Sequence, residues 1–224
     1  MGSSRPTSRT TARRAGGSTP VRVREQGETP RSGFSRREVA EFAGCSLSAI
    51  DKAIEQRVVP KRKDHGETVI GEDGLAVMVM LCHAQLDLPV KAKHLVRDWI
   101  SNDRPFAGAR RNLELSDVVV LRVPESAREI VAEAAAYARD RDRLIVSDPD
   151  IFGGQPVIAG TRIPVHTLAE RLEGGDSIDM LAEDFPHVDR RAFQIAGRYA
   201  RTHPRRGRPA KPWLSPASRR ASRV

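Results

Sequence analysis

The stretch FSRREVAEFAGCSLSAIDKAIEQRVVP, residues 34–60, has the features of two short helices joined by a tight turn. Ser35 stands three residues before Glu38, which is the spacing of a capping box at a helix start. Gly44 is expected to end that helix, because glycine adopts the left-handed conformation that closes helices. Ser46 can then cap a second helix. The stretch therefore predicts a helix, a short turn and a second helix.

The second helix is expected to bury Leu47, Ile50 and Ile54 and to expose the opposite face. A helix, a short turn and a second helix with small polar residues at its start is the layout of a helix-turn-helix. An αα-hairpin without any DNA contact has the same pattern. The residues of this segment that we assign to DNA binding are Ser46, Ser48, Ala49 and Lys52.

The segment that follows, VVPKRKDHGETVIGEDGLAVM at residues 58–78, favours the DNA-binding interpretation. It predicts a short strand, a basic turn at Lys61, Arg62 and Lys63, a second strand, and a helix from about Glu72. A basic hairpin directly after a helix-turn-helix is a wing, so these three cations are further candidate DNA contacts. Residues 33–72 resemble the DNA-binding domain of the MerR superfamily, and the resemblance implies a winged helix-turn-helix.

Two further helices are expected within residues 74–102, separated by Pro89. Together with the wing they complete a first domain over residues 33–103. Their many apolar positions suit a core or a dimer surface. His83 and His94 are interpreted as helix-surface residues, and we expect no metal site.

Residues 113–147 combine strand-like and helical patterns. LELSDVVVLRV predicts a strand that ends before Pro124, ESAREIVAEAAAYARDRD predicts a strong helix, and RLIVS predicts a second short strand. The segment thus predicts a small β-α-β linking region. We expect it to contribute to a homodimer.

Residues 147–201 contain the most distinctive motif of the chain, GQPVIAGTRIPV at residues 154–165. It predicts two short extended pieces joined through Gly160, which can adopt a positive φ. Three helices are expected to follow, at about residues 165–172, 177–184 and 189–201. Their surface is acidic, which disfavours close approach to phosphates.

This motif, with EDFP at residues 183–186, resembles the bacterial family called domain of unknown function 433. The resemblance implies a VapB-type antitoxin, the partner of a PIN-like ribonuclease in a toxin–antitoxin pair. Four residues of the motif are assigned structural roles in the turns and in holding the hairpin against the helices: Gly154, Gly160, Thr161 and Arg162.

The net charge of +9 is concentrated at the two ends of the chain. Residues 1–31 carry +5 and residues 201–224 carry +8, whereas residues 32–200 carry −4. Both ends are rich in Ser, Thr, Pro, Gly and Arg, so residues 1–31 and 202–224 are predicted to be disordered basic arms.

The C-terminal arm admits two interpretations. RGRP at residues 206–209 resembles the core of an AT-hook, which lies in an A·T minor groove. The alternative, which we favour, is that the arm fills the carboxylate-lined metal site of a PIN-like ribonuclease, with Trp213 as an apolar anchor. The residues assigned to toxin binding are Arg205, Arg206, Arg208, Lys211 and Trp213.

Other classes of protein are disfavoured. The chain has no apolar run of membrane-spanning length and no apolar stretch of a secretory signal, so we expect a cytoplasmic protein. Its two cysteines, far apart in sequence, are interpreted as reduced thiols of the core. No catalytic motif is found, so neither catalysis nor a cofactor is expected.

The sequence as a whole predicts a mainly helical α+β protein that acts as an antitoxin. In this interpretation it neutralises a PIN-like ribonuclease and regulates its own operon by binding operator DNA. A MerR-like transcription regulator without a toxin partner is the main alternative. An architectural DNA-binding protein that uses both arms is a weaker one.

Overall fold

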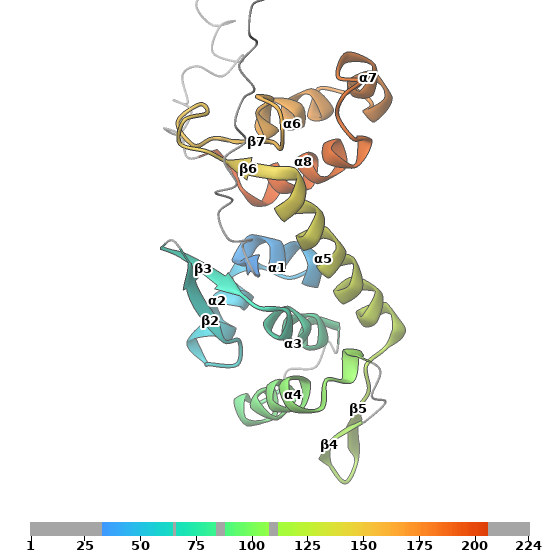
Figure 1. The fold of residues 1–224 in the computed structure, drawn as a ribbon. Coiled ribbons are helices and arrows are strands. Elements are labelled where there is room, and N and C mark those ends of the chain that lie inside the picture. Colours follow the sequence, from blue (N-terminus) through green and yellow to red (C-terminus); the bar gives the residue numbers. More distant parts are fainter. Residues whose placement is uncertain (1–32, 65, 84–87, 108–111, 206–224) are drawn as a thin grey trace, which may run out of the picture. The chain divides into compact units, whose positions relative to one another are not determined.

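The computed structural model describes residues 33–64, 66–83, 88–107 and 112–205, which combine helices with small antiparallel sheets (Figure 1). The α-helices of these residues are α1 (Arg36–Ala43), α2 (Leu47–Glu55), α3 (Glu72–His83), α4 (Val90–Asp103), α5 (Glu125–Leu144), α6 (Val165–Glu173), α7 (Ile178–Asp184) and α8 (Arg190–Thr202). The strands are β1 (Phe34–Ser35), β2 (Lys61–Asp64), β3 (Glu67–Ile70), β4 (Leu113–Ser116), β5 (Val119–Leu121), β6 (Ile145–Ser147) and β7 (Pro156–Ile158).

The starts of the first two helices and the end of the first lie at the residues that the sequence predicts. Ser35 and Glu38 form a complete capping box at the start of α1, and Gly44 closes that helix with a φ of 64°. The Ser46 hydroxyl accepts a hydrogen bond from the Ala49 N–H at the start of α2. The prediction for Leu47 was wrong: this side chain, in the first residue of α2, is 39% exposed.

A three-stranded antiparallel sheet with the order β1-β3-β2 adjoins the helix pair. Strands β2 and β3 form a hairpin, in which Lys61 lies opposite Ile70 and Lys63 opposite Thr68. The basic residues expected in the turn of this hairpin lie in strand β2 instead. The turn comes later, after Asp64, and is closed by Gly66 with a φ of 82°.

One apolar core joins the helix pair to α3, α4 and α5. It includes Phe34, Val39 and Ile50 from the first elements, most of α3, and Ala134 and Tyr137 from α5. None of the described helices is both long enough and apolar enough to cross a membrane.

The predicted β-α-β linking region is not observed. Residues 113–121 form the hairpin β4–β5 instead of one strand, because Asp117 and Val118 make a turn between them. The strand after α5 pairs with β7, so the strands on either side of α5 belong to different sheets. Strand order depends on pairing partners distant in the chain, which local sequence patterns do not specify.

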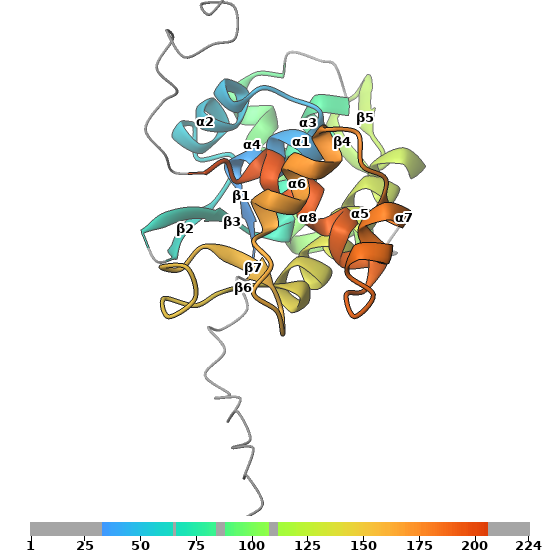
Figure 2. The ribbon, with the colours of Figure 1, turned by 90° about the horizontal axis from the view of Figure 1, so that it is seen from above.

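The C-terminal part consists of the β6–β7 hairpin and helices α6, α7 and α8. It has its own core, in which Val165, Leu168, Leu181 and Phe193 are fully buried. Helices α6 and α8 lie against each other in both ribbon views (Figures 1 and 2). Ser177 and Asp189 cap α7 and α8, which confirms the three predicted helices.

Helix α8 also packs against α1 and α5, so the C-terminal part contacts the first helix pair. The Arg198 guanidinium lies 4.6 Å from the centre of the Phe42 ring and pairs with Glu41 and Glu133. Arg201 adds a second ion pair to Glu41, at 3.1 Å. These contacts tie α8 to the helix that precedes α2.

Candidate nucleic-acid interface

Helix α2 presents a polar face away from the core. Ser48 and Lys52 are four residues apart and exposed, so they lie on the same side of the helix. Ala49 is half-buried beside them, while Ile50 and Ala53 on the other side are buried. The amphipathic spacing of α2 therefore fixes which side chains are available to a ligand.

Two local interactions order the start of this face. The Ser46 and Ser48 hydroxyls are 2.9 Å apart and hydrogen-bond each other. Arg36 of α1 donates to the Asp51 carboxylate at 2.6 Å, which offsets the only negative charge near the middle of α2. The exposed face then carries the positive charge of Lys52 and, three residues further on, the exposed carboxylate of Glu55, so its charges are mixed.

The β2–β3 hairpin divides its three cations between two faces. Side chains alternate along a strand, so Lys61 and Lys63 lie on the face that Ile70 shares, and Arg62 lies on the other face. All three are exposed. The sequence does not reveal which cations share a face, because it predicts a turn at these positions.

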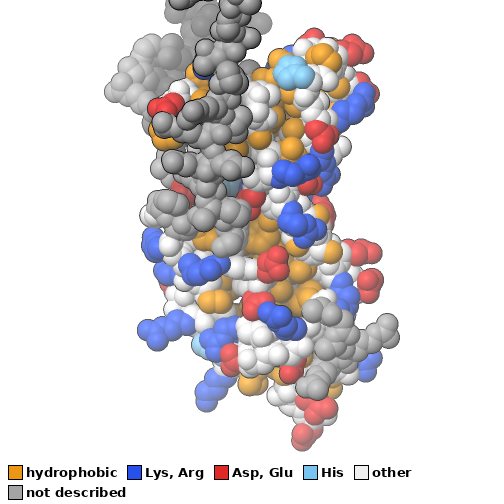
Figure 3. Space-filling view, in the orientation of Figure 1, with side chains coloured by type: hydrophobic (Ala, Val, Ile, Leu, Met, Phe, Trp, Pro, Cys, Tyr) orange, Lys and Arg blue, Asp and Glu red, His pale blue; other side chains and the backbone are white. Residues whose placement is uncertain are grey.

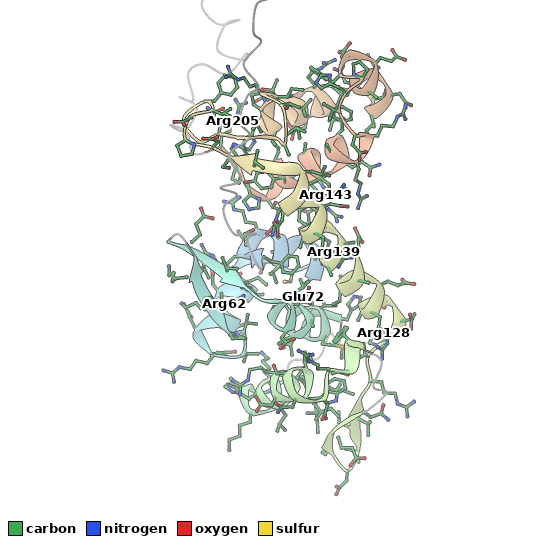
Figure 4. The ribbon with its side chains drawn as sticks, viewed as in Figure 1. Arg62, Glu72, Arg128, Arg139, Arg143 and Arg205 are labelled. Carbon is green, nitrogen blue, oxygen red and sulfur yellow. The ribbon has the colours of Figure 1, made fainter. Side chains whose placement is uncertain are left out.

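Arg62 borders an open cavity of about 280 Å³ together with Glu72, Arg139 and Asp142. Figure 4 shows Arg62 on the hairpin, Glu72 at the start of α3 and Arg139 on α5, the elements that surround this cavity. The cavity contains two cations and two carboxylates. Its charges balance, in contrast to the purely basic pair Lys61 and Lys63.

Helix α2 and the β2–β3 hairpin lie on the same side of the described residues in both ribbon views (Figures 1 and 2). Lys and Arg side chains gather around the hairpin in the space-filling view (Figure 3). Arg57, which sequence reasoning did not select, is a further exposed cation between α2 and β2. Its backbone has a φ of 56°, which the end of α2 imposes.

The structural residues of the C-terminal motif lie in its turns. Gly154 and Gly160 have φ values of 84° and 73°, which L-residues with side chains rarely adopt. The Thr161 hydroxyl donates to the Ile158 carbonyl and accepts from the Ile163 N–H, so it holds the loop closed. Arg162 is exposed and has no ion pair among the residues that the structure describes.

Arg205 is the one residue of the proposed toxin-binding set that lies within the described residues. It pairs with Glu170 of α6 at 3.1 Å, and both side chains are about half exposed. Burial and the nearby Arg205 lower the pKa of His166, while Glu170 opposes this shift. Arg206, Arg208, Lys211 and Trp213 lie outside the described residues, as does the N-terminal arm at residues 1–31.

A buried ion pair connects α1 to α5. The sequence analysis did not predict it. Glu38 and Arg141 are 1% and 3% exposed, and their side chains meet at 2.8 Å. Glu38 also accepts from the Ser35 N–H, while Arg141 donates to the Gly33 carbonyl and to Asp142. Burial would raise the pKa of Glu38, but Arg141, His203 and the Ser35 N–H hold it below its ordinary value.

Comparison with protein families identifies the C-terminal part. Residues 145–200 match the model of the family described as protein of unknown function, DUF433. This segment is therefore a DUF433 domain, and it begins at strand β6. The start at β6 agrees with the pairing of β6 with β7, and it places the domain boundary two residues before the predicted one.

Two known proteins are similar to this chain over part of its length. The uncharacterized protein y4eO of Sinorhizobium fredii (strain NBRC 101917 / NGR234) is 40% identical over 65 residues. That match spans 29% of this chain and 29% of the length of the relative. The crystal structure of Rv2018 from Mycobacterium tuberculosis aligns with a TM-score of 0.32 and 14% identity, over 75% of this chain and 97% of that one.

Proposed function

We propose that this protein is a DNA-binding antitoxin that reads its own operator and neutralises a PIN-like ribonuclease. In this proposal α1, α2 and the β2–β3 hairpin act as a winged helix-turn-helix. The observation that carries it is the exposed polar face of α2 beside a hairpin whose Lys61 and Lys63 are exposed on one sheet face. Such an arrangement suits a helix in the major groove and a wing on the phosphates.

The assignment of contacts follows from charge and reach. Lys52, Lys61 and Lys63 bind phosphates, because a flexible ammonium group serves as a point charge for them. Ser48 and Ala49 face the base edges, since short side chains let the helix approach the groove closely. Arg62 lies on the opposite face of the hairpin and is assigned no contact with DNA.

The toxin-directed half of the proposal rests on the DUF433 domain and on the basic arm that follows it. The arm leaves α8 at a surface that carries the carboxylates of α6, where Arg205 pairs with Glu170. Acidic residues on this domain disfavour DNA there and leave it available for a protein partner. A MerR-like regulator without a toxin is the alternative, and it predicts DNA binding but no effect on a ribonuclease.

A homodimer is part of the proposal, because one winged helix-turn-helix contacts only one half-site. Apolar side chains that remain exposed on α4 and on the β4–β5 hairpin support it. Val118 is 89% exposed and Val120 is 46% exposed, and Leu95 on α4 is 47% exposed. Strand β4, which pairs with β5, packs on α4, so the hairpin as a whole adjoins that helix.

Replacing Lys52, Lys61 and Lys63 together with alanine should weaken binding to the DNA upstream of the gene by about tenfold to a hundredfold at ~0.15 M salt. Each lost phosphate contact should also flatten the plot of log affinity against log salt concentration by about one unit. Electrophoretic titration at several salt concentrations measures both quantities.

The sharpest control compares two neighbours of equal charge. Lys63→Ala removes a cation from the proposed DNA face, whereas Arg62→Ala removes one from the opposite face. We expect the first to reduce affinity and the second to leave it nearly unchanged. Equal losses for the two variants would mean that DNA binding does not use this face of the hairpin.

A further inference from the structure

The β4–β5 hairpin has an inner face that packs on the core and an outer face that does not. Leu113 and Leu121 lie opposite each other in the ladder and pack against the apolar core, and β4 contacts α4 (Figure 1). Side chains alternate along a strand, so Glu114, Val120 and Arg122 lie on the other side. All three are exposed, and we call them the outer hairpin face.

The outer hairpin face carries one charge of each sign. Glu114 lies directly across the ladder from Val120, and Arg122 follows Val120 by two residues. Among the residues that the structure describes, neither Glu114 nor Arg122 has an ion-pair partner. Asp117, the remaining charged residue of the hairpin, lies in the turn. A partner that matches this face must present both signs in the reverse order, since a partner of one sign would oppose a like charge.

A second copy of the chain meets this requirement. A two-fold axis in the plane of the interface, midway between Glu114 and Arg122, exchanges the two positions, so the carboxylate of each copy meets the guanidinium of the other. Val120 is about 5 Å from Glu114 across the ladder and about 7 Å from Arg122 along the chain. A residue at similar distances from both positions lies close to the axis, so the two Val120 side chains meet. The result is an apolar centre between two ion pairs.

We propose that the outer hairpin face is the interface between two copies of this chain. The inference rests on the homodimer of the proposed function and adds how the two chains meet. A two-stranded sheet is marginally stable by itself, and no other described strand pairs with β4 or β5, so the hairpin gains support from a second copy. Val118 in the turn is 89% exposed and extends the apolar surface of the hairpin.

Reversing one charge should separate the two copies. Glu114→Arg leaves two guanidinium groups on the outer hairpin face, and Arg122→Glu leaves two carboxylates, so like charges meet twice in either variant. Sedimentation equilibrium of the full-length protein should show a dimer for the wild type. The dissociation constant should be about tenfold to a hundredfold higher for each variant. Combining both substitutions in one chain should restore the wild-type value.

Mixing the two single variants tests whether the ion pairs join different chains. A Glu114→Arg chain and an Arg122→Glu chain together make two attractive pairs, so a mixed dimer should form in preference to either homodimer. Native mass spectrometry identifies it, because the two substitutions change the mass in opposite directions. An ion pair within one chain predicts no such rescue. Only folded chains give the mixed dimer, so poor folding of a variant cannot imitate this result.

Val120→Asp should weaken the dimer by a similar factor, because it places two carboxylates against each other at the centre of the interface. Val146→Asp is the matched control. Val146 is also a valine of a short strand and is 39% exposed, compared with 46% for Val120, but it lies in β6. This control should leave the dissociation constant unchanged.

The proposal fails if the wild-type protein is monomeric, a result that would also remove the homodimer from the proposed function. It fails as well if the wild type is a dimer that neither charge reversal weakens. That result would exclude the outer hairpin face as the interface and leave the homodimer itself intact. The absence of mixed dimers between the two single variants would likewise contradict the pairing of Glu114 with Arg122 of the second copy.

Discussion

Replacing Glu38 with glutamine should lower the free energy of unfolding by about 3–5 kcal/mol. The variant keeps the shape of the side chain but leaves the Arg141 guanidinium, which is 3% exposed, without the carboxylate of α1. A buried charge without its partner costs far more than an exposed one. Chemical denaturation measures the loss directly, and the melting temperature should fall by an amount on the order of 10 °C.

Removing both charges should be less harmful than removing one. We expect the double variant Glu38→Met with Arg141→Met to be more stable than either single variant, because no buried charge then remains unpaired. The exposed pair Arg190 and Asp179 is the control, and Arg190→Ala should change stability by less than about 0.5 kcal/mol. A Glu38→Gln effect as small as that of the control would contradict this account of the core.

Low pH should remove the stabilisation that the ion pair of Glu38 with Arg141 gives to the wild-type protein. The folded-state pKa of Glu38 lies below its ordinary value of 4.5, so its contribution is fully present above about pH 4.5. It is lost as the pH falls through the folded-state pKa. The stability difference between wild type and Glu38→Gln should therefore shrink progressively below pH ~4.5.

Deleting residues 206–224 should release most of the activity of the partner ribonuclease, if the proposed function holds. The deleted arm contains Arg206, Arg208 and Lys211, whose charges would compete with Mg²⁺ for the carboxylates of the nuclease site. Without these charges, Mg²⁺ and RNA can bind at the nuclease site. Trp213→Ala alone should weaken docking by about 2 kcal/mol, the cost of losing a buried aromatic anchor.

Cleavage of RNA by the PIN-like ribonuclease that the proposal requires, titrated with full-length and truncated chains, measures this release. Deletion of the N-terminal arm, residues 1–31, is the matched control, since it also removes a basic segment but should leave inhibition intact. Equal inhibition by the full-length chain and by the chain without residues 206–224 would exclude the arm from the nuclease site. If the chain without residues 206–224 still inhibits the ribonuclease but binds A·T-rich DNA more weakly, this result would support the minor-groove alternative.

Local structure was predictable wherever the signal is local. The capping box of Ser35 and Glu38 and the caps Ser46, Ser177 and Asp189 all occur as the sequence indicates. Each of these signals acts within a few residues of the helix end that it sets. The starts of α1, α2, α7 and α8 therefore follow from short stretches of sequence.

Pairings between distant residues were not predictable in the same way. The pairing of β6 with β7 and the ion pair of Glu38 with Arg141 join segments whose local patterns contain no mutual signal. Glu38 illustrates the difference. Its capping role is evident from the sequence, but its contact with α5 depends on how the helices pack.

The candidate DNA-binding site was likewise predictable in its local features but not in its strand pairing. Lys52 is on the exposed face of α2, as the helical spacing predicts. The basic residues 61–63 were correctly selected as a hairpin, but their assignment to a turn hid the alternation that separates Arg62 from its neighbours. One residue of register decides which of these cations share a face.

The most direct test of the central claim is a competition titration with the DNA upstream of the gene and with a shuffled sequence of the same length. Basic arms alone bind DNA through charge and do not distinguish the two sequences. A helix that reads base edges should favour the upstream DNA by about a thousandfold or more at ~0.15 M salt. Equal affinity for both sequences would contradict the assignment of α2 and the β2–β3 hairpin to operator recognition.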